Sequence, residues 1–222
     1  RHPSSTQHLF KHMPGARHIV WCNSIGLRKP DLCVNDMVRA VSKVRAFLGR
    51  PAPSHDNADP RMSVVQPFAI PAPRHAATRS FNRHMLKRQV GRAAQQMGLK
   101  DPVLWISLPA AAPLVGAFGA LKTVYYCGDD FSALAGVDHS AVVELEQELV
   151  RTCDLIFAAS AEIASRLPAN KTAVLPHGVD LEFFNRPALR PADLPAGRPI
   201  AGFYGTLAPW LDLELIEKAA AS

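Results

Sequence analysis

The chain has 222 residues and a formal net charge of +6, and 48% of its residues are hydrophobic while 20% are charged. This composition is typical of a globular protein and excludes a collagen-like or intrinsically disordered chain. No run approaches the roughly 20 apolar residues of a membrane-spanning helix, and residues 1–6 do not resemble a secretion signal, so we expect neither element here.

Short apolar runs alternate with segments of helical periodicity along the chain. The runs predict strands over residues 18–23, 63–70, 103–107, 123–127, 154–158, 172–175 and 200–204. Helices are predicted over residues 7–13, 36–48, 80–98, 112–120, 138–153, 161–167 and 211–221. The strands are almost continuously apolar, as strands covered on both faces must be. The alternation predicts an α/β fold with a Rossmann-like, doubly wound parallel sheet.

Two of the predicted helices carry opposite charge. The helix over residues 80–98 starts from Ser80 as its N-cap and ends at Gly98. Its apolar side is formed by Leu86, Val90, Ala93, Ala94 and Met97, and its other side is basic, with Arg79, Arg83, Lys87, Arg88 and Arg92. In the helix over residues 138–153 we expect Glu144, Glu146 and Glu148 to point away from the apolar side.

Positive charge is concentrated in the first half of the chain. Residues 1–100 hold 17 Lys and Arg with 4 Asp and no Glu, whereas residues 101–222 hold 8 basic and 15 acidic residues. A basic half attracts nucleic acid, an anionic membrane surface or a phosphorylated substrate. A solvated surface that is rich in arginine explains the same composition, and both interpretations stay open.

The cysteines indicate neither a metal site nor a disulfide framework. Cys22, Cys33, Cys127 and Cys153 show no CxxC spacing and no cluster of histidines around them. We expect no bound metal and a reducing, cytoplasmic compartment, with peripheral association at the inner face of the membrane as an open possibility.

Ligands of doubly wound sheets bind outside the carboxyl ends of the strands. Asp129 and Asp130 follow the fourth predicted strand, where paired carboxylates suit proton abstraction or the binding of a hydroxyl. A turn or a helix cap explains the same aspartates. His177 and Gly178 follow the sixth strand, where the histidine can donate to a phosphate or hydroxyl and the glycine permits close approach of a backbone.

The segment Pro-His-Gly-Val-Asp at residues 176–180 resembles the P-[NH]-G-V-D segment of two-domain glycosyltransferases of the GT-B type. Residues 125–131, 144–149 and 153–160 look like the matching run in bacterial polysaccharide and teichuronic-acid type transferases. Residues 202–206 and 210–216 resemble the first strand, loop and helix of the donor-binding domain. The match in order and spacing covers residues 123–216, while residues 1–100 match loosely.

The resemblance implies transfer of a sugar from a nucleotide-sugar to a glycan or lipid-linked acceptor in cell-envelope polysaccharide synthesis, without another cofactor. Residues 1–185 would form the acceptor-binding domain, residues 186–199 a proline-rich linker, and residues 200–222 the start of the donor-binding domain. The family's opening strand and the carboxylates that hold the donor nucleotide are not found in this stretch. We therefore expect a fragment that does not turn over by itself.

The resemblance also assigns residues to the two substrates. Asp129 would lie on the acceptor side, with His177 and Gly178 near the cleft between the domains. The paired carboxylates Asp129 and Asp130 are the candidate catalytic residues. Gly205 and Thr206 would face the donor diphosphate through the backbone, because Ala208, Pro209 and Trp210 stand where many family members carry a basic residue. Arg28, Arg74 and His75 follow the first two strands and are expected to bind acceptor phosphates.

Two other functions stay open. A nucleic-acid-binding module would use the basic first half, but no RNA or DNA motif is present and Phe81 is the only ring in the basic helix. We therefore expect no nucleic-acid partner. A sugar-nucleotide epimerase of the GT-B type is the other alternative, and a requirement for a glycan acceptor would distinguish it from a transferase.

Overall fold

The computed structural model describes residues 4–13, 15, 17–24, 60–68, 76–132, 139–194, 197, 200, 202–203 and 211–221. The helix predicted over residues 36–48 lies outside these residues. The chain divides into two compact units, Arg1–Gly178 and Val179–Ser222, which we describe separately. The domain bounds at residues 185 and 199 stay a prediction.

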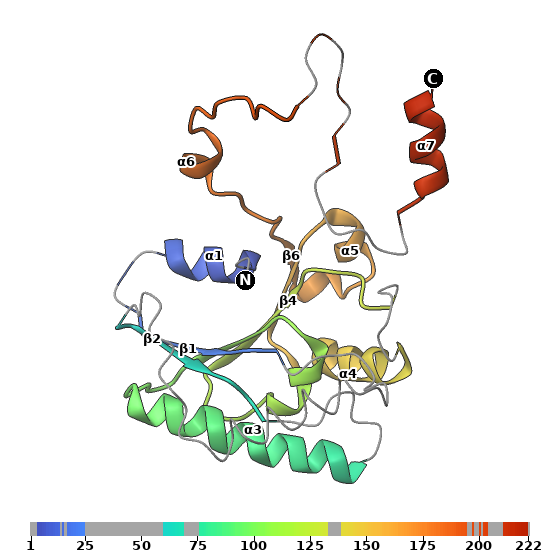
Figure 1. The fold of residues 1–222 in the computed structure, drawn as a ribbon. Coiled ribbons are helices and arrows are strands. Elements are labelled where there is room, and N and C mark those ends of the chain that lie inside the picture. Colours follow the sequence, from blue (N-terminus) through green and yellow to red (C-terminus); the bar gives the residue numbers. More distant parts are fainter. Residues whose placement is uncertain are drawn as a thin grey trace, which may run out of the picture. The chain divides into compact units, whose positions relative to one another are not determined.

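The first unit is an α/β fold built on parallel strands (Figure 1). Strands β1 (Ile19–Cys22) and β2 (Met62–Val65) form a parallel pair in which Ile19 lies opposite Met62. Strands β3 (Val103–Ile106), β4 (Lys122–Cys127), β5 (Leu155–Ala158) and β6 (Thr172–Val174) form a second sheet in that order, with every neighbouring pair parallel. The predicted α/β class and parallel pairing are confirmed.

The strand order of the second sheet runs in one direction, so each connection moves the chain to the next position on the same side. Right-handed connections of this kind place their helices on one face of the sheet. Helix α4 (His139–Thr152) and helix α5 (Ala161–Ser165) both follow this rule, because side chains of both join the same core. The reversal of direction that defines a doubly wound sheet is not seen among the described strands and stays a prediction.

Helices lie on both faces of the parallel sheets in the first unit. Helix α1 (Ser5–His12) lies on one side, and α3 (Ala76–Gln96) and α4 lie on the other (Figure 1). Ser4 caps α1 by accepting from the Gln7 amide, while the Gln7 side chain accepts from the Ser4 amide. Gly98 ends α3 at φ +65, as predicted, because glycine adopts this left-handed conformation without a steric penalty.

Two local predictions are wrong. The helix α3 begins four residues before Ser80, which is therefore an interior residue and not the N-cap, because the preceding alanines continue the helix. The predicted helix over residues 112–120 is replaced by the short 3-10 helix η1 (Pro109–Leu114) and a run of turns. Gly116, Phe118 and Gly119 adopt positive φ angles there, which an α-helix cannot contain.

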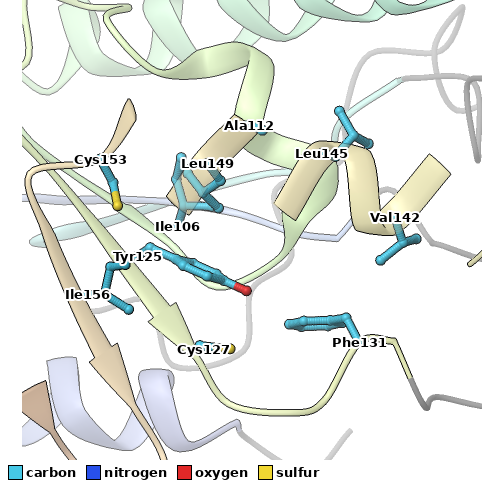
Figure 2. Packing of buried hydrophobic residues seen from close by; sticks show 10 residues of the cluster. All are labelled: Ile106, Ala112, Tyr125, Cys127, Phe131, Val142, Leu145, Leu149, Cys153 and Ile156. Carbon is cyan, nitrogen blue, oxygen red and sulfur yellow. The ribbon is translucent and has the colours of Figure 1, made fainter. Parts of the chain in front are cut away.

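The core of the first unit lies between the second sheet, η1 and α4. Ile106, Tyr125 and Ile156 lie side by side on three neighbouring strands and point toward α4 (Figure 2). Leu145 and Leu149 of α4 pack against them, and Leu149 is fully buried. Only β4 is buried on both faces along nearly its whole length, because it has a strand on each side and helices above and below. The core therefore holds the carboxyl end of β4 firmly.

The second unit contains two helices in its described part, α6 (Leu181–Phe184) and α7 (Leu213–Ala221). Asp180 caps α6 by accepting from the Phe183 amide at 2.9 Å. Sequence reasoning missed α6. Of the strand predicted over residues 200–204, the structure describes residues 200 and 202–203, and none of these is in a strand. Ile200 and Phe203 are 44% and 56% exposed, and a strand without a described partner has no ladder to join.

Candidate functional site

The carboxyl ends of β3 to β6 form one edge of the second sheet, since all four strands are parallel. Ser107 follows β3, the Gly128–Asp130 turn follows β4, and His177 lies in the loop after β6. The sheet thus brings together two segments that sequence reasoning selected separately, one after the fourth predicted strand and one after the sixth.

His177 is held at this edge by Tyr126. The Tyr126 hydroxyl lies 2.9 Å from the His177 Nδ1 atom, and the two rings meet edge to face with centroids 6.0 Å apart. When the hydroxyl donates to Nδ1, the neutral imidazole carries its own proton on Nε2. His177 is exposed while Tyr126 is buried, so a buried phenol orients an imidazole that remains accessible to a ligand.

Burial sets the chemical state of the Tyr126 hydroxyl. Desolvation raises the pKa of Tyr126, and the negative charge of Asp129 raises it further. The hydroxyl therefore stays protonated at neutral pH and is available as a donor. Sequence reasoning assigned Tyr126 no role, although its position two residues before Gly128 places it on the same side of the strand end.

Gly128 makes room for this arrangement. A Cβ atom added at Gly128 would lie 3.3 Å from the Tyr126 Cε1 atom and 3.6 Å from the His177 Cε1 atom. The first distance is tighter than nearly all real Cβ contacts. Gly128→Ala would therefore require the Tyr126 ring to shift by a few tenths of an ångström. Gly178, by contrast, has no atom within 4 Å of such a Cβ, so nothing in the described structure requires a glycine there.

An aromatic layer supports Tyr126 on the face of the sheet that is opposite α4. Trp105 stacks between Tyr126 and Phe157, with ring centroids 5.9 and 5.7 Å apart. Phe10 of α1 meets Trp105 edge to face at 5.3 Å. The hydroxyl groups of Thr6 and Ser107 lie 3.1 Å apart and join α1 to the end of β3. Helix α1 thus covers the layer from which the Tyr126 hydroxyl reaches the site.

The two aspartates after β4 have different surroundings. Asp130 accepts from the Ser132 amide at 3.1 Å and from the Ser132 hydroxyl, and it pairs with the Arg166 guanidinium. The Ser132 hydroxyl bond is the largest cause that lowers the pKa of Asp130, and Arg166 lowers it further. An ionised carboxylate with these partners favours the turn-holding role for Asp130. Sequence reasoning missed both Ser132 and Arg166.

Asp129 is exposed, and its carboxylate has no hydrogen bond or ion pair with any other residue that the structure describes. Its backbone carbonyl accepts from the Cys127 thiol at 3.6 Å. The carboxylate lies close enough to Tyr126 to raise the pKa of that hydroxyl. Asp129 is therefore the acidic group of the pair that is available to a ligand.

The prediction that Glu146 of α4 points away from the apolar side is wrong. The Glu146 Oε1 atom accepts from the Tyr125 hydroxyl at 2.6 Å and from the Cys127 thiol at 3.5 Å. The Tyr125 hydroxyl points toward α4, the helix that carries Glu146 (Figure 2). Burial raises the pKa of the Cys127 thiol to about 12, so this thiol is a structural group and not a nucleophile.

The remaining predicted site residues lie outside the described part of the chain. These are Arg28, Arg74, His75, Gly205 and Thr206. The site that the described residues form consists of Tyr126, Gly128, Asp129 and His177, all in the first unit. It offers one free carboxylate and one oriented imidazole, a combination that can accept a hydrogen bond from a hydroxyl and donate one to an oxygen or a phosphate.

No family model matches the chain, and no curated protein matches it. The fold class, α/β with parallel sheets, is established by the structure. None of the described helices is both long and apolar enough to cross a bilayer.

Proposed function

We propose that the chain is the acceptor-binding part of a glycosyltransferase of the GT-B type, which moves a sugar from a nucleotide-sugar to a glycan or lipid-linked acceptor in cell-envelope polysaccharide synthesis. The observation that carries this proposal is the pairing of His177 with Tyr126 beside the free carboxylate of Asp129. Both segments that resemble the family end in this edge of the sheet, and ligands of parallel α/β sheets bind at such edges.

The proposed chemistry assigns one task to each side chain. The Asp129 carboxylate accepts a hydrogen bond from the acceptor hydroxyl and takes its proton as the oxygen attacks the anomeric carbon. The bond from that carbon to the donor phosphate breaks, and the nucleoside diphosphate leaves with the electron pair. His177, with its Nδ1 atom held by Tyr126, donates from Nε2 to an oxygen of the bound substrates.

The acceptor side is also where the predicted phosphate contacts of Arg28, Arg74 and His75 belong. Guanidinium groups bind phosphate with two parallel hydrogen bonds, which suits a lipid-linked diphosphate. The donor diphosphate would lie on Gly205 and Thr206 through backbone amides. The assignments of Gly205 and Thr206 rest on the sequence resemblance, and those of Arg28, Arg74 and His75 on their positions after the first two predicted strands. Asp129 and His177 are supported in addition by their geometry.

The test uses the complete product of the gene with labelled UDP-, GDP- and dTDP-sugars and a membrane extract as acceptor. Asp129→Asn should lower transfer about 100- to 10,000-fold while donor binding stays unchanged. Asp101→Asn is the matched control, because Asp101 is exposed and its φ of 48 is one that asparagine adopts readily. Its transfer rate should equal that of the wild type.

Three outcomes would contradict the proposal. Equal loss of donor binding and transfer in Asp129→Asn would remove the acceptor-side role of that carboxylate. Conversion of the sugar-nucleotide without any acceptor would identify an epimerase. No turnover with any donor would leave the fold without a transferase function.

A further inference from the structure

Helix α3 buries one side from Asn82 to Ala93. Leu86, Val90 and Ala93 are 3%, 9% and 6% exposed, which confirms most of the predicted apolar side. The helix contacts β1, β2 and η1 with this side. Because about 3.6 residues make one turn, His84, Arg88 and Arg92 lie on the opposite side, and all three are exposed. We call these three residues the basic face of α3.

Among the described residues, the acidic side chains Glu144 and Glu148 of α4 lie near another side of α3. Arg79 turns toward α4 and pairs with Glu144 at 3.2 Å, which corrects the prediction that Arg79 belongs to the free basic side. Arg79 and Arg83 line a groove that also contains Glu148 of α4. Arg88 and Arg92 form no ion pair or hydrogen bond with any residue that the structure describes. Helix α3 contains no acidic residue, so no side chain of α3 itself neutralises the charge of the basic face.

The shape of the basic face suits a flat anionic surface. Helix α3 has 21 residues and is about 31 Å long, and it contacts β1, β2 and η1 with its buried side while the residues of the basic face are exposed (Figure 1). Phe81, which is 42% exposed, lies on the same side of α3 three residues before His84 and adds an apolar ring that can enter the headgroup region. Each basic residue near an anionic bilayer strengthens binding about fivefold.

The same features disfavour nucleic acid as the partner. A recognition helix must enter a major groove about 12 Å wide, and a helix embedded along its length cannot project that far. Single-stranded nucleic acid is held by several aromatic rings between basic residues, whereas Phe81 is the only ring on α3.

We propose that the basic face of α3 is a docking surface for an anionic lipid bilayer, with Arg88 and Arg92 against the headgroup phosphates and Phe81 at the interface. The proposal does not depend on the proposed sugar transfer, because it concerns a different side of the first unit and a different ligand. Of the three partners that a basic first half attracts, namely nucleic acid, an anionic membrane surface and a phosphorylated substrate, the membrane surface fits the exposed side of α3 best.

The test is sedimentation of the full chain with vesicles of phosphatidylcholine alone and of phosphatidylcholine mixed with phosphatidylglycerol. The chain should bind the mixed vesicles, and added salt should release it. Arg88→Gln/Arg92→Gln should weaken this binding roughly 25-fold. The control Lys11→Gln/Arg186→Gln removes the same charge from exposed positions elsewhere and should leave binding within about twofold.

A second variant separates charge from folding. Arg88→Lys/Arg92→Lys keeps the charge and should bind mixed vesicles within about twofold of the wild type, as expected for headgroup attraction without a fixed fork geometry. Equal binding to both kinds of vesicle, or equal loss in the control pair, would overturn the proposal. Tighter binding to an RNA or DNA oligonucleotide than to mixed vesicles, lost in Arg88→Gln/Arg92→Gln, would assign the face to nucleic acid and overturn it too.

Discussion

The adjacent tyrosines of β4 provide a sharp test of the site, because they point to opposite faces of one strand and bind different partners. Tyr125 is fully buried and donates at 2.6 Å to the Glu146 carboxylate. The Tyr126 hydroxyl lies 2.9 Å from the exposed His177 ring. Replacing each by phenylalanine removes one hydroxyl and leaves the aromatic packing almost unchanged.

The expected losses of stability differ for a physical reason. A hydrogen bond to a charged group contributes about 1.5–3 kcal/mol, and Tyr125→Phe leaves a partly buried carboxylate without its donor, so we expect a loss of about 2 kcal/mol. A bond between neutral groups contributes about 0.5–1.5 kcal/mol, and water can replace the donor to His177, so Tyr126→Phe should cost about 0.5 kcal/mol. For a chain of this size these losses correspond to about 4–8 °C and about 1–2 °C in Tm.

The assay is urea unfolding followed by tryptophan fluorescence, with transfer activity of the complete gene product measured alongside. Tyr125→Phe should lower the unfolding midpoint and leave the rate of the folded enzyme near that of the wild type. Tyr126→Phe should change the unfolding midpoint little and lower the transfer rate, because it frees the imidazole of His177. Equal destabilisation by the two changes, or a larger loss for Tyr126→Phe, would refute the assignment of Tyr125 to structure and Tyr126 to the site.

Two further predictions concern the turn after β4. Gly128→Ala should lower activity and cost about 1 kcal/mol of stability, because the new Cβ would lie 3.3 Å from Tyr126 and must displace the ring that holds His177. Activity comparable to that of the wild type with an unchanged unfolding midpoint would count against this close approach. For Asp130, the lowered pKa means that its stabilising contribution is present above the ordinary aspartate pKa and is lost as the pH falls through the lowered value. The stability difference between the wild type and Asp130→Asn should therefore be constant near neutral pH and disappear in acid. Arg166→Gln should shift that pH dependence back toward the pKa of an unperturbed aspartate. A stability difference that persists in strong acid would exclude the ionised role of Asp130.

Several elements were predictable because they depend on local patterns. The run that contains β4 is apolar because that strand is buried on both faces, and in β5 every second residue is buried. An almost continuously apolar run of this kind predicts a strand in a parallel sheet. Gly98 ends α3 as predicted, since the left-handed conformation is a property of that single residue. The position of Asp129 and His177 at one edge of the sheet follows from the parallel direction of the strands that precede them.

Predictions from local patterns were wrong where one stretch of sequence is compatible with two local conformations. Residues 112–120 are mostly apolar, with three alanines, and fit a helix, but three residues there adopt positive φ angles before the chain enters β4. Ser80 fits an N-cap, but a serine inside a helix has the same sequence neighbourhood. Glu146 fits a solvated helix face, and only the Tyr125 hydroxyl beside it draws it inward.

The class of fold, most of the strands and the candidate loops after β4 and β6 could be predicted from the sequence, because burial and chain reversal leave traces in consecutive residues. Which side chains in those loops have partners depends on tertiary contacts. The bond between Tyr126 and His177 joins residues 51 positions apart, and the partners of Asp130 include Arg166, 36 positions away. Such pairs depend on the register between strands and on the packing of helices against them, and no pattern of neighbouring residues encodes either directly.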